Sequence, residues 1–274
     1  MGYLYEILAC FCIIFVVVSY DRTPDILRMG TFLIGSTVFV LIWIPIMIFT
    51  PRNYRNALGP ATCCRDLCWL LGFTMEVRGL ENLITKSGAV VVMNQQSVLD
   101  LCVLAHLWPV IGQATVVAKR KMLFIPIFGF GAWLWGTMFT NLSKIPDSIE
   151  MVQKESKAIN AGKCKLLLFP EGTRNSEETL LPFKEGAFHI AVHSQCPIQP
   201  VVISKFEFLD SKTKIFTPGH AIIHIMPPIY TKGYNMDDLD RIIKQTRYVM
   251  QAEFTKLSQE AKDINSKDRS HLFK

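Results

Sequence analysis

Residues 165–174 read KLLLFPEGTR, an apolar stretch that ends in charged and turn-forming residues. A short, continuous apolar run that stops at a Pro and a Gly is typical of a strand covered on both faces of its sheet. In α/β folds, ligands bind outside the carboxyl ends of such strands. The stretch therefore predicts a buried strand and a site built from the polar residues that follow it, which are Glu171, Gly172, Thr173 and Arg174.

A second stretch, residues 91–100, has the same form and reads VVMNQQSVLD. Its apolar half predicts a strand that ends near Asn94, and Gln95 follows in the strand-end loop. Asp100 would then lie on the first turn of a following helix. Both stretches place polar residues at the carboxyl edge of a sheet, where α/β folds build their sites.

Short β-type runs alternate with helical patterns after residue 70. These runs are FTMEV (73–77), AVVVM (89–93), ATVVA (114–118), KLLLF (165–169), QPVVI (199–203) and AIIHIM (221–226). Helices are predicted over 148–161, where Asp147 can cap the start, and over 236–262, where apolar residues recur at helical spacing. Strands that alternate with helices indicate an α/β domain, which we place at 52–265. A polar tail follows over 266–274.

Residues 31–50, TFLIGSTVFVLIWIPIMIFT, form an uncharged run of 20 residues. At about 1.5 Å per residue, a helix of this length crosses a hydrocarbon core of roughly 30 Å. Residues 2–20 form another apolar run long enough to span, so residues 1–51 predict a transmembrane helical hairpin. Arginines, beginning with Arg52 and Arg55, follow the second span. The positive-inside rule therefore places the α/β domain in the cytosol.

Residues 122–139, MLFIPIFGFGAWLWGTMF, are uncharged and about as long as a membrane span. A third crossing is one interpretation, but Pro126 and several glycines interrupt the segment. A full crossing would also separate the residues on its two sides by a bilayer. We favour a buried or shallowly inserted helical element that contacts acyl chains.

The composition points to a membrane protein. Half of the 274 residues are hydrophobic and only 19% are charged, whereas soluble domains carry about a quarter charged residues. The net charge of +6 suits anionic lipid headgroups or phosphorylated substrates. The aromatic residues lie in apolar runs and not between basic residues, so no nucleic-acid partner is predicted.

The eight cysteines lack the spacing of a disulfide framework or a zinc site. We expect reduced thiols that fill apolar space. The alternative is palmitoylation of the cluster Cys63, Cys64 and Cys68 near the membrane exit. His189 and His193 share a helix face, yet no acidic ligand or H-E-x-x-H pattern accompanies them, so no metal site is predicted.

The two polar-ended stretches resemble the first and third motif blocks of glycerolipid acyltransferases, N-H-x4-D and F-P-E-G-T-R. Residues 180–192, LLPFKEGAFHIAV, and 196–204, CPIQPVVIS, resemble the fourth block of animal 1-acylglycerol-3-phosphate (lysophosphatidate) acyltransferases. The resemblance runs from about residue 52 to 260 and implies that family's α/β fold. It also implies an enzyme of phospholipid biosynthesis in the endoplasmic reticulum membrane. Acyl-CoA would be its co-substrate, lysophosphatidate its acceptor, and no cofactor would be needed.

The resemblance also implies roles for individual residues. In the family, a histidine oriented by the aspartate at position 100 deprotonates the lysolipid hydroxyl, which then attacks the thioester. A base five residues before a carboxylate cannot share one helix face with it, since five residues turn about 500°. A base in the strand-end loop can, however, be held by a carboxylate at the helix start.

Arg174 resembles the family's phosphate ligand, and its guanidinium suits a bidentate grip on phosphate. Glu171 and Gly172, with Thr173 in the same motif, would shape the acceptor pocket. Further candidate partners for phosphate or CoA lie elsewhere in the basic segments, although each is equally well explained as a solvated side chain. They are Lys119, Arg120, Lys121 and Lys184.

The sequence departs from the family pattern at two positions. Gln95 occupies the place of the catalytic histidine, and an amide cannot take up a proton near neutral pH. Leu142 stands where the second block, G-x-x-F-I-x-R, has its arginine. His106, six residues beyond Asp100, would point away from the site. Two functions stay open: an acyltransferase of reduced activity, and an inactive lipid-binding or regulatory relative, natural or engineered.

Overall fold

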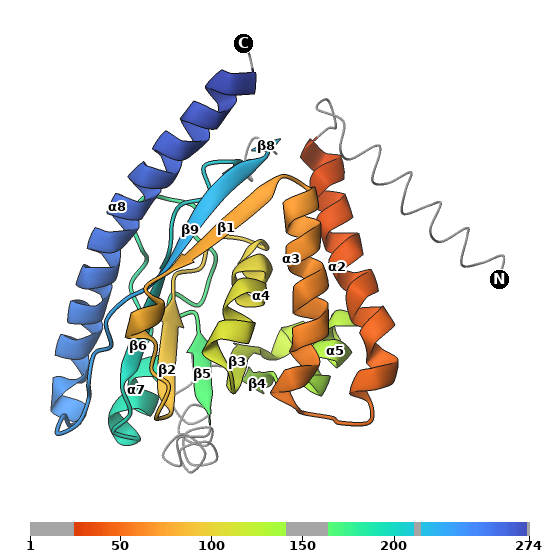
Figure 1. Cartoon of the computed structure of the whole chain (residues 1–274). Coiled ribbons are helices and arrows are strands. Elements are labelled where there is room, and N and C mark those ends of the chain that lie inside the picture. Colours follow the sequence, from red (N-terminus) through yellow and green to blue (C-terminus); the bar gives the residue numbers. More distant parts are fainter. Residues whose placement is uncertain (1–24, 141–163, 211–214, 273–274) are drawn as a thin grey trace.

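The computed structural model describes residues 25–140, 164–210 and 215–272. Seven strands form one sheet in the order β1-β9-β6-β2-β5-β3-β4 (Figure 1). They are β1 (Phe73–Arg78), β2 (Ala89–Met93), β3 (Ala114–Lys119), β4 (Met138–Thr140), β5 (Lys165–Leu168), β6 (Ile198–Ile203) and β9 (Gly219–Ile225). All neighbours in this sheet are parallel except β6 and β9. Each of the six predicted runs is a strand, so the α/β class is confirmed.

Helices cover both faces of the sheet. On one face lie α3 (Leu58–Leu70) and α4 (Asp100–Ile111), with α2 (Asp25–Met47) packed outside them; on the other lie α7 (Gly186–His193) and α8 (Leu239–Leu272) (Figure 1). Each face of the sheet has its own hydrophobic core, and successive side chains along a strand belong to the two cores in turn. Val91 and Met93 pack towards α3 and α4, whereas Val90 and Val92 pack towards α7 and α8. Successive side chains of a strand point to opposite faces, which is why these runs are continuously apolar.

Smaller elements complete the described chain. The antiparallel pair β7 (Leu209–Asp210) and β8 (Ile215–Phe216) stands apart from the main sheet. The 3-10 turns are η1 (Tyr54–Ala57), η2 (Leu80–Asn82), η3 (Arg120–Phe124) and η4 (Met236–Asp238). A short helix, α5 (Phe128–Leu134), packs against α2.

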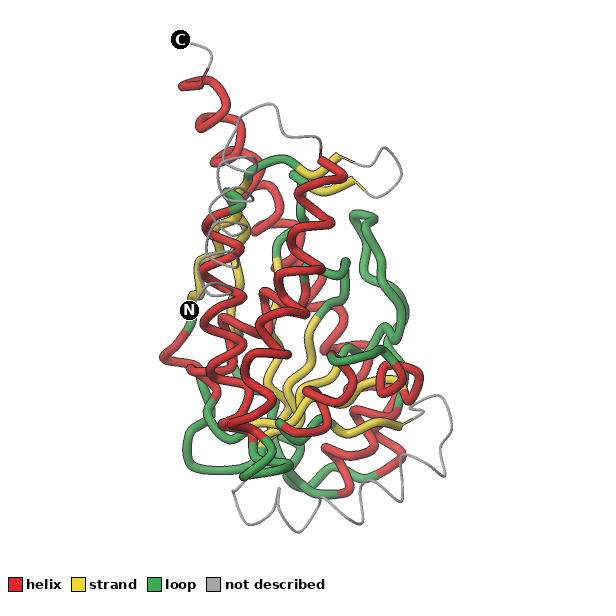
Figure 2. Tube along the Cα trace, turned by 90° about the vertical axis from the view of Figure 1, so that its right-hand side faces the viewer, coloured by secondary structure: helices red, strands yellow, loops and turns green. Residues whose placement is uncertain are grey.

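Among the described residues, one helix is long and apolar enough to cross a membrane. It is α2, over Leu27–Met47. It begins before the predicted residue 31 and ends before residue 50. It lies beside α3 along one side of the molecule (Figures 1 and 2). Phe32, Val40 and Met47 form its buried stripe, whereas Ile34 and Ile46 on the other side are exposed. The predicted span over 2–20 lies outside the described residues, so the hairpin stays a prediction.

The segment over 122–139 contains no continuous helix. It is divided into the end of η3, α5 and the start of β4, with left-handed backbone at Ile127 and Gly136. A Cβ on Gly129 would lie 2.1 Å from the backbone oxygen of Leu123, so only glycine permits this fold-back. This shape contradicts a third crossing by one helix and agrees with the buried or shallow alternative.

Helix α8 continues well past the predicted residue 262. Residues 263–272 contain neither Gly nor Pro, so nothing in this stretch stops the helix. Asn265 is buried, and its side chain pairs with both backbone groups of His220 on β9. The polar tail is therefore largely helical (Figure 2). The predicted helix over 148–161 and Leu142 lie outside the described residues.

Candidate active site

A cavity of about 500 Å³ opens at the carboxyl ends of β2, β3 and β5, between the sheet and helices α2 to α5. The structure brings seven of the predicted site residues to its wall. They are Gln95, Asp100, Lys119, Gly172, Thr173, Arg174 and Lys184. Strand ends and a helix start converge here, as expected for an α/β site. Glu171 lies behind the wall.

The side chains of Asn94 and Gln96, on either side of Gln95, fix the loop after β2 through hydrogen bonds to the backbone that follows β6 or ends it. The Asn94 side chain donates to the Ile203 carbonyl at 3.0 Å and accepts from the Ile203 N–H at 2.8 Å. The Gln96 side chain donates to the Ser204 carbonyl at 2.9 Å and accepts from the Phe206 N–H at 3.0 Å. Because side chains alternate along an extended chain, Gln95 is left facing the cavity. This bracing role of Asn94 and Gln96 was not predicted from the sequence, because their partners Ile203, Ser204 and Phe206 lie more than 100 residues away in the chain.

Asp100 closes the same loop from the first turn of α4. Its Oδ2 accepts the backbone N–H groups of Gln96 at 3.0 Å and Ser97 at 3.1 Å. The side chain is buried, and its Oδ1 has no hydrogen-bond partner. Burial raises the pKa of Asp100 to about 7, against the opposing effect of the two N–H bonds. The buried carboxyl group beside the cavity thus has one oxygen without a hydrogen-bond partner, and that oxygen is covered from solvent.

Glu171 braces the two motif loops against each other. Its Oε1 accepts the backbone N–H of Gln95 at 2.9 Å, and its Oε2 accepts the N–H of Leu181 at 2.9 Å. Only 3% of the residue is exposed. Burial raises the pKa of this carboxyl. Glu171 therefore positions the two loops from behind the cavity wall, and its expected part in shaping the acceptor pocket stays a prediction.

Three cationic side chains gather at the wall. Lys119 ends β3, Arg174 follows the turn after β5, and Lys184 precedes α7; all three are exposed. Gly172 has a φ of +66°, and a Cβ there would lie 2.8 Å from Nζ of Lys184. Glycine at this position therefore allows the turn and the close approach of the lysine. The grouped positive charge suits an anionic group such as phosphate.

The remainder of the cavity wall is apolar. Helix α4 contributes Leu101, Leu104, Ala105 and Trp108, which share one face at helical spacing. The indole N–H of Trp108 donates to the Tyr54 carbonyl at 2.8 Å, which satisfies its polar group. Further apolar side chains from α2, α3 and the 122–139 segment complete this wall, among them Val40, Pro60, Ala61, Phe128, Ala132 and Trp135. The 3.6-residue spacing of these four residues of α4 is the sequence signal that predicts a common helix face.

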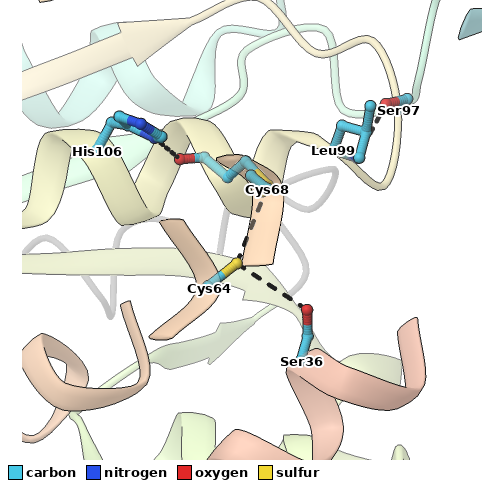
Figure 3. Close-up of a disulfide and its surroundings, with 7 residues drawn as sticks. Ser36, Cys64, Cys68, Ser97, Leu99 and His106 are labelled. Carbon is cyan, nitrogen blue, oxygen red and sulfur yellow. Dashed lines mark hydrogen bonds between the residues drawn. A yellow bond between two sulfur atoms is a disulfide. The ribbon is translucent and has the colours of Figure 1, made fainter. Parts of the chain in front are cut away.

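Three cysteines lie together beside the cavity (Figure 3). A disulfide joins Cys68 of α3 to Cys102 of α4, and Cys64 Sγ lies 4.0 Å from Cys102 Sγ. Cys64 Sγ also lies 3.9 Å from Ser36 Oγ on α2. The disulfide corrects the expectation of reduced thiols for Cys68 and Cys102, because the packing of α3 against α4 joins residues that are distant in sequence. The other cysteines of the described residues are reduced thiols, as expected: Cys63, Cys64, Cys164 and Cys196. Burial raises the pKa of Cys64 to about 11.

No histidine of the described chain lines the cavity. His106 points along α4, with Nδ1 2.8 Å from the Cys102 carbonyl oxygen (Figure 3). His189 lies 3.5 Å from Glu185, and His224 lies 2.8 Å from Glu253. These positions agree with the expectation that none of the three replaces the missing base.

The chain is similar in sequence to known acyltransferases. A family model described as acyltransferase matches residues 74–204. The chain is 33% identical over 216 residues to 1-acyl-sn-glycerol-3-phosphate acyltransferase alpha of Homo sapiens, covering 78% of this chain and 76% of the relative. It is 37% identical over 181 residues to the Saccharomyces cerevisiae 1-acyl-sn-glycerol-3-phosphate acyltransferase, covering 65% and 59%.

A solved structure shares the fold. The crystal structure of the 1-acyl-sn-glycerophosphate (LPA) acyltransferase PlsC from Thermotoga maritima superposes with a TM-score of 0.65. The sequences are 20% identical, and the match covers 87% of this chain and 99% of the bacterial chain. The mixed α/β sheet with its covering helices is therefore an arrangement found in a solved acyltransferase.

Proposed function

Because the chain belongs to the 1-acyl-sn-glycerol-3-phosphate acyltransferase family, we propose that it transfers an acyl group from acyl-CoA to the free hydroxyl of lysophosphatidate. The product would be phosphatidate, a precursor of phospholipids. The observation that carries this proposal is the composition of the cavity wall. Cationic side chains and a long apolar surface line one space, together with a buried carboxyl group. Such a space suits a molecule that has both a phosphate and an acyl chain.

Each substrate group has a matching part of the wall. Arg174 would hold the acceptor phosphate through its planar guanidinium, and Lys184 and Lys119 would add charge for phosphate or for CoA. The apolar face of α4 would hold an acyl chain. Gly172 and Thr173 would shape the acceptor side, and Glu171 would hold that loop against Gln95. No resident cofactor enters this reaction.

The proposed setting is the endoplasmic reticulum membrane. Residues 1–51 would anchor the chain through two spans, and the domain over 52–265 would face the cytosol, where acyl-CoA is available. Supporting this, α2 is apolar enough to cross a bilayer and carries exposed aliphatic side chains on its outer side, such as Ile34 and Ile46. Basic residues such as Arg52 follow α2.

Gln95 lowers the expected rate. Loss of a general base typically costs about 10²–10⁴-fold, and an amide has no proton affinity at neutral pH. This observation favours a second candidate function, an inactive relative that binds lysolipid or acyl-CoA without turnover. The retained cationic wall fits both candidates.

The test is acyl transfer from radiolabelled oleoyl-CoA to lysophosphatidate by the purified, detergent-solubilised chain, beside its Gln95→His variant. We expect slow turnover by the chain as it stands and a rate at least about tenfold higher for Gln95→His. Arg174→Ala in both backgrounds is the matched comparison and should weaken transfer to lysophosphatidate by raising its KM.

The outcomes separate the candidates. Turnover by Gln95→His alone would support the inactive relative and exclude the enzyme. Equal rates for both would show that a base at position 95 is irrelevant. Absence of transfer by both proteins would contradict acyl transfer to lysophosphatidate altogether.

A further inference from the structure

We propose that Asp100 itself is the general base of this chain, and that its free Oδ1 takes the proton of the acceptor hydroxyl. In the family pattern the carboxylate orients a histidine, whereas here it would act on the substrate directly. This inference rests on the proposed acyl transfer and names the group that makes it possible without a histidine.

The two oxygens of Asp100 have different surroundings. Oδ2 is held by the N–H groups of Gln96 and Ser97, which fixes the plane of the carboxyl group. Oδ1 is buried without a partner, although the residue lines the cavity and is only 5% exposed. A buried acceptor left without a hydrogen bond costs about 1–3 kcal/mol. A hydroxyl group that displaces the atoms covering Oδ1 would supply the missing donor.

The backbone of the neighbouring residue is already engaged elsewhere. The N–H of Gln95 donates to Glu171, and its carbonyl accepts the N–H of Asn175 at 2.9 Å. The described cavity wall holds no histidine, and His106 is turned to the Cys102 carbonyl. Oδ1 has no hydrogen-bond partner but is covered from solvent, so a substrate hydroxyl must displace the atoms that cover it in order to reach it.

The electrostatic setting suits proton transfer near neutral pH. Burial raises the pKa of Asp100 to about 7, and a general base works best when its pKa is near the operating pH. Two charged groups act on this carboxyl from the loop after β5. Arg174 lowers the pKa, and the carboxylate of Glu171 raises it. The neighbouring side chains of the loop after β2, Gln95, Gln96 and Ser97, are uncharged.

The step is balanced without another reactant. The carboxylate of Asp100 accepts the hydroxyl proton as the hydroxyl oxygen attacks the thioester carbonyl carbon. The new C–O ester bond forms, the C–S bond breaks, and CoA leaves as a thiolate. The thiolate takes the proton back from Asp100, which restores the carboxylate. The reaction consumes and releases no net proton.

The experiment is chemical rescue of Asp100→Ala by formate, a small carboxylate that can occupy the vacated space. We expect acyl transfer to fall at least about 100-fold in Asp100→Ala and to recover at least tenfold in formate. Chloride at the same ionic strength should restore nothing. A carboxyl group that only orients the loop would not be replaced by a diffusible carboxylate.

Two further variants test whether activity is lost only because the protein fails to fold. Asp100→Asn keeps an oxygen that can accept the Gln96 and Ser97 N–H groups, and it loses no bond at the Oδ1 position. It should fold and bind acyl-CoA like the original chain, yet remain inactive. Asp66→Ala removes an exposed carboxylate of α3 and should neither lose activity nor respond to formate.

The results distinguish this inference from the function on which it rests. If the chain turns over and formate fails to rescue Asp100→Ala, Asp100 is not the base, and acyl transfer still stands. If the chain does not turn over while Gln95→His does, the proposed activity fails and Asp100 is insufficient as a base. If formate rescues Asp100→Ala and chloride does not, the result supports both the proposed acyl transfer and the role of Asp100 as its base.

Discussion

The backbone N–H of Gln95 donates to Oε1 of Glu171 at 2.9 Å, and this bond joins the loop after β2 to the loop after β5. A second bond runs in the other direction, from the N–H of Asn175 to the carbonyl of Gln95. Glu171 also accepts the N–H of Leu181 through its other oxygen. The glutamate thereby sets the spacing between the position of the family base and the loop that carries Arg174.

We expect Glu171→Gln to destabilise the fold and to reduce acyl transfer. An amide offers one acceptor oxygen, so its NH₂ group would face an N–H donor at Gln95 or at Leu181. An unsatisfied buried donor costs about 1–3 kcal/mol. Thermal unfolding of the detergent-solubilised protein measures the loss of stability, and the radiolabel assay measures transfer.

Glu81→Gln is the matched control, because Glu81 is an exposed residue of η2 far from the cavity wall. It should change neither quantity. If Glu171→Gln unfolded at the original temperature and kept its rate within about twofold, the bracing role of the carboxylate would be wrong.

Replacement of Arg174 should affect one substrate selectively. We expect Arg174→Ala to raise the KM for lysophosphatidate at least about tenfold, since a charge-assisted hydrogen bond contributes about 1.5–3 kcal/mol. The KM for acyl-CoA should change by less than about twofold. Monoacylglycerol, which lacks the phosphate, should be used equally poorly by both proteins. Arg241→Ala, on the exposed side of α8, is the control. An equal rise in both KM values would contradict a phosphate-specific role.

The apolar wall predicts a change in acyl-chain preference. Ala61 of α3 lines the cavity, and Ala61→Leu would fill part of its volume. Each buried methylene group contributes about 0.8 kcal/mol, so loss of room for two or more should cost at least about tenfold. We expect kcat/KM for palmitoyl-CoA to fall by this factor relative to decanoyl-CoA. Ala252→Leu, on an exposed turn of α8, should leave the ratio unchanged. An unchanged ratio in Ala61→Leu would place the acyl chain elsewhere.

Much of the fold was predictable because parallel strands covered on both faces carry a simple signal. AVVVM over 89–93 is buried at every position of β2, and the runs at β5 and β6 are equally continuous. The site followed from the same signal. Polar residues after such a run must lie at one edge of the sheet, and Gln95 and Arg174 indeed line one cavity.

Features that depend on tertiary packing were not predictable. The pairing of Cys68 with Cys102 requires α3 to lie against α4, which no local spacing encodes. The inward turn of Glu171 depends on the N–H groups of two distant loops. The division of 122–139 was signalled by its glycines, but its fold-back against η3 was not, because the close approach of Gly129 to Leu123 is visible only in three dimensions.

The raised pKa of Asp100 makes a prediction about stability that needs no substrate. An aspartate in the unfolded chain has a pKa of about 3.9, whereas burial raises that of folded Asp100 to about 7. Between these values the folded protein holds a proton that the unfolded protein has released. The contribution of Asp100 to the free energy of unfolding therefore falls as the pH rises from about 4 to 7, and it is constant outside that window.

The difference between the chain and Asp100→Asn isolates this contribution, because all other carboxyl groups, Glu171 included, are common to both. Three pKa units correspond to about 4 kcal/mol, at 1.36 kcal/mol each. We expect the Asn variant to gain up to about 4 kcal/mol of stability relative to the original chain over the whole window, of which about 2.5 kcal/mol falls between pH 5 and 8. Denaturant unfolding of the solubilised proteins at four pH values measures it, with Asp66→Asn as the control. A difference independent of pH would show that folded Asp100 ionises at its ordinary pKa and carries its charge throughout this range, although its Oδ1 has no partner.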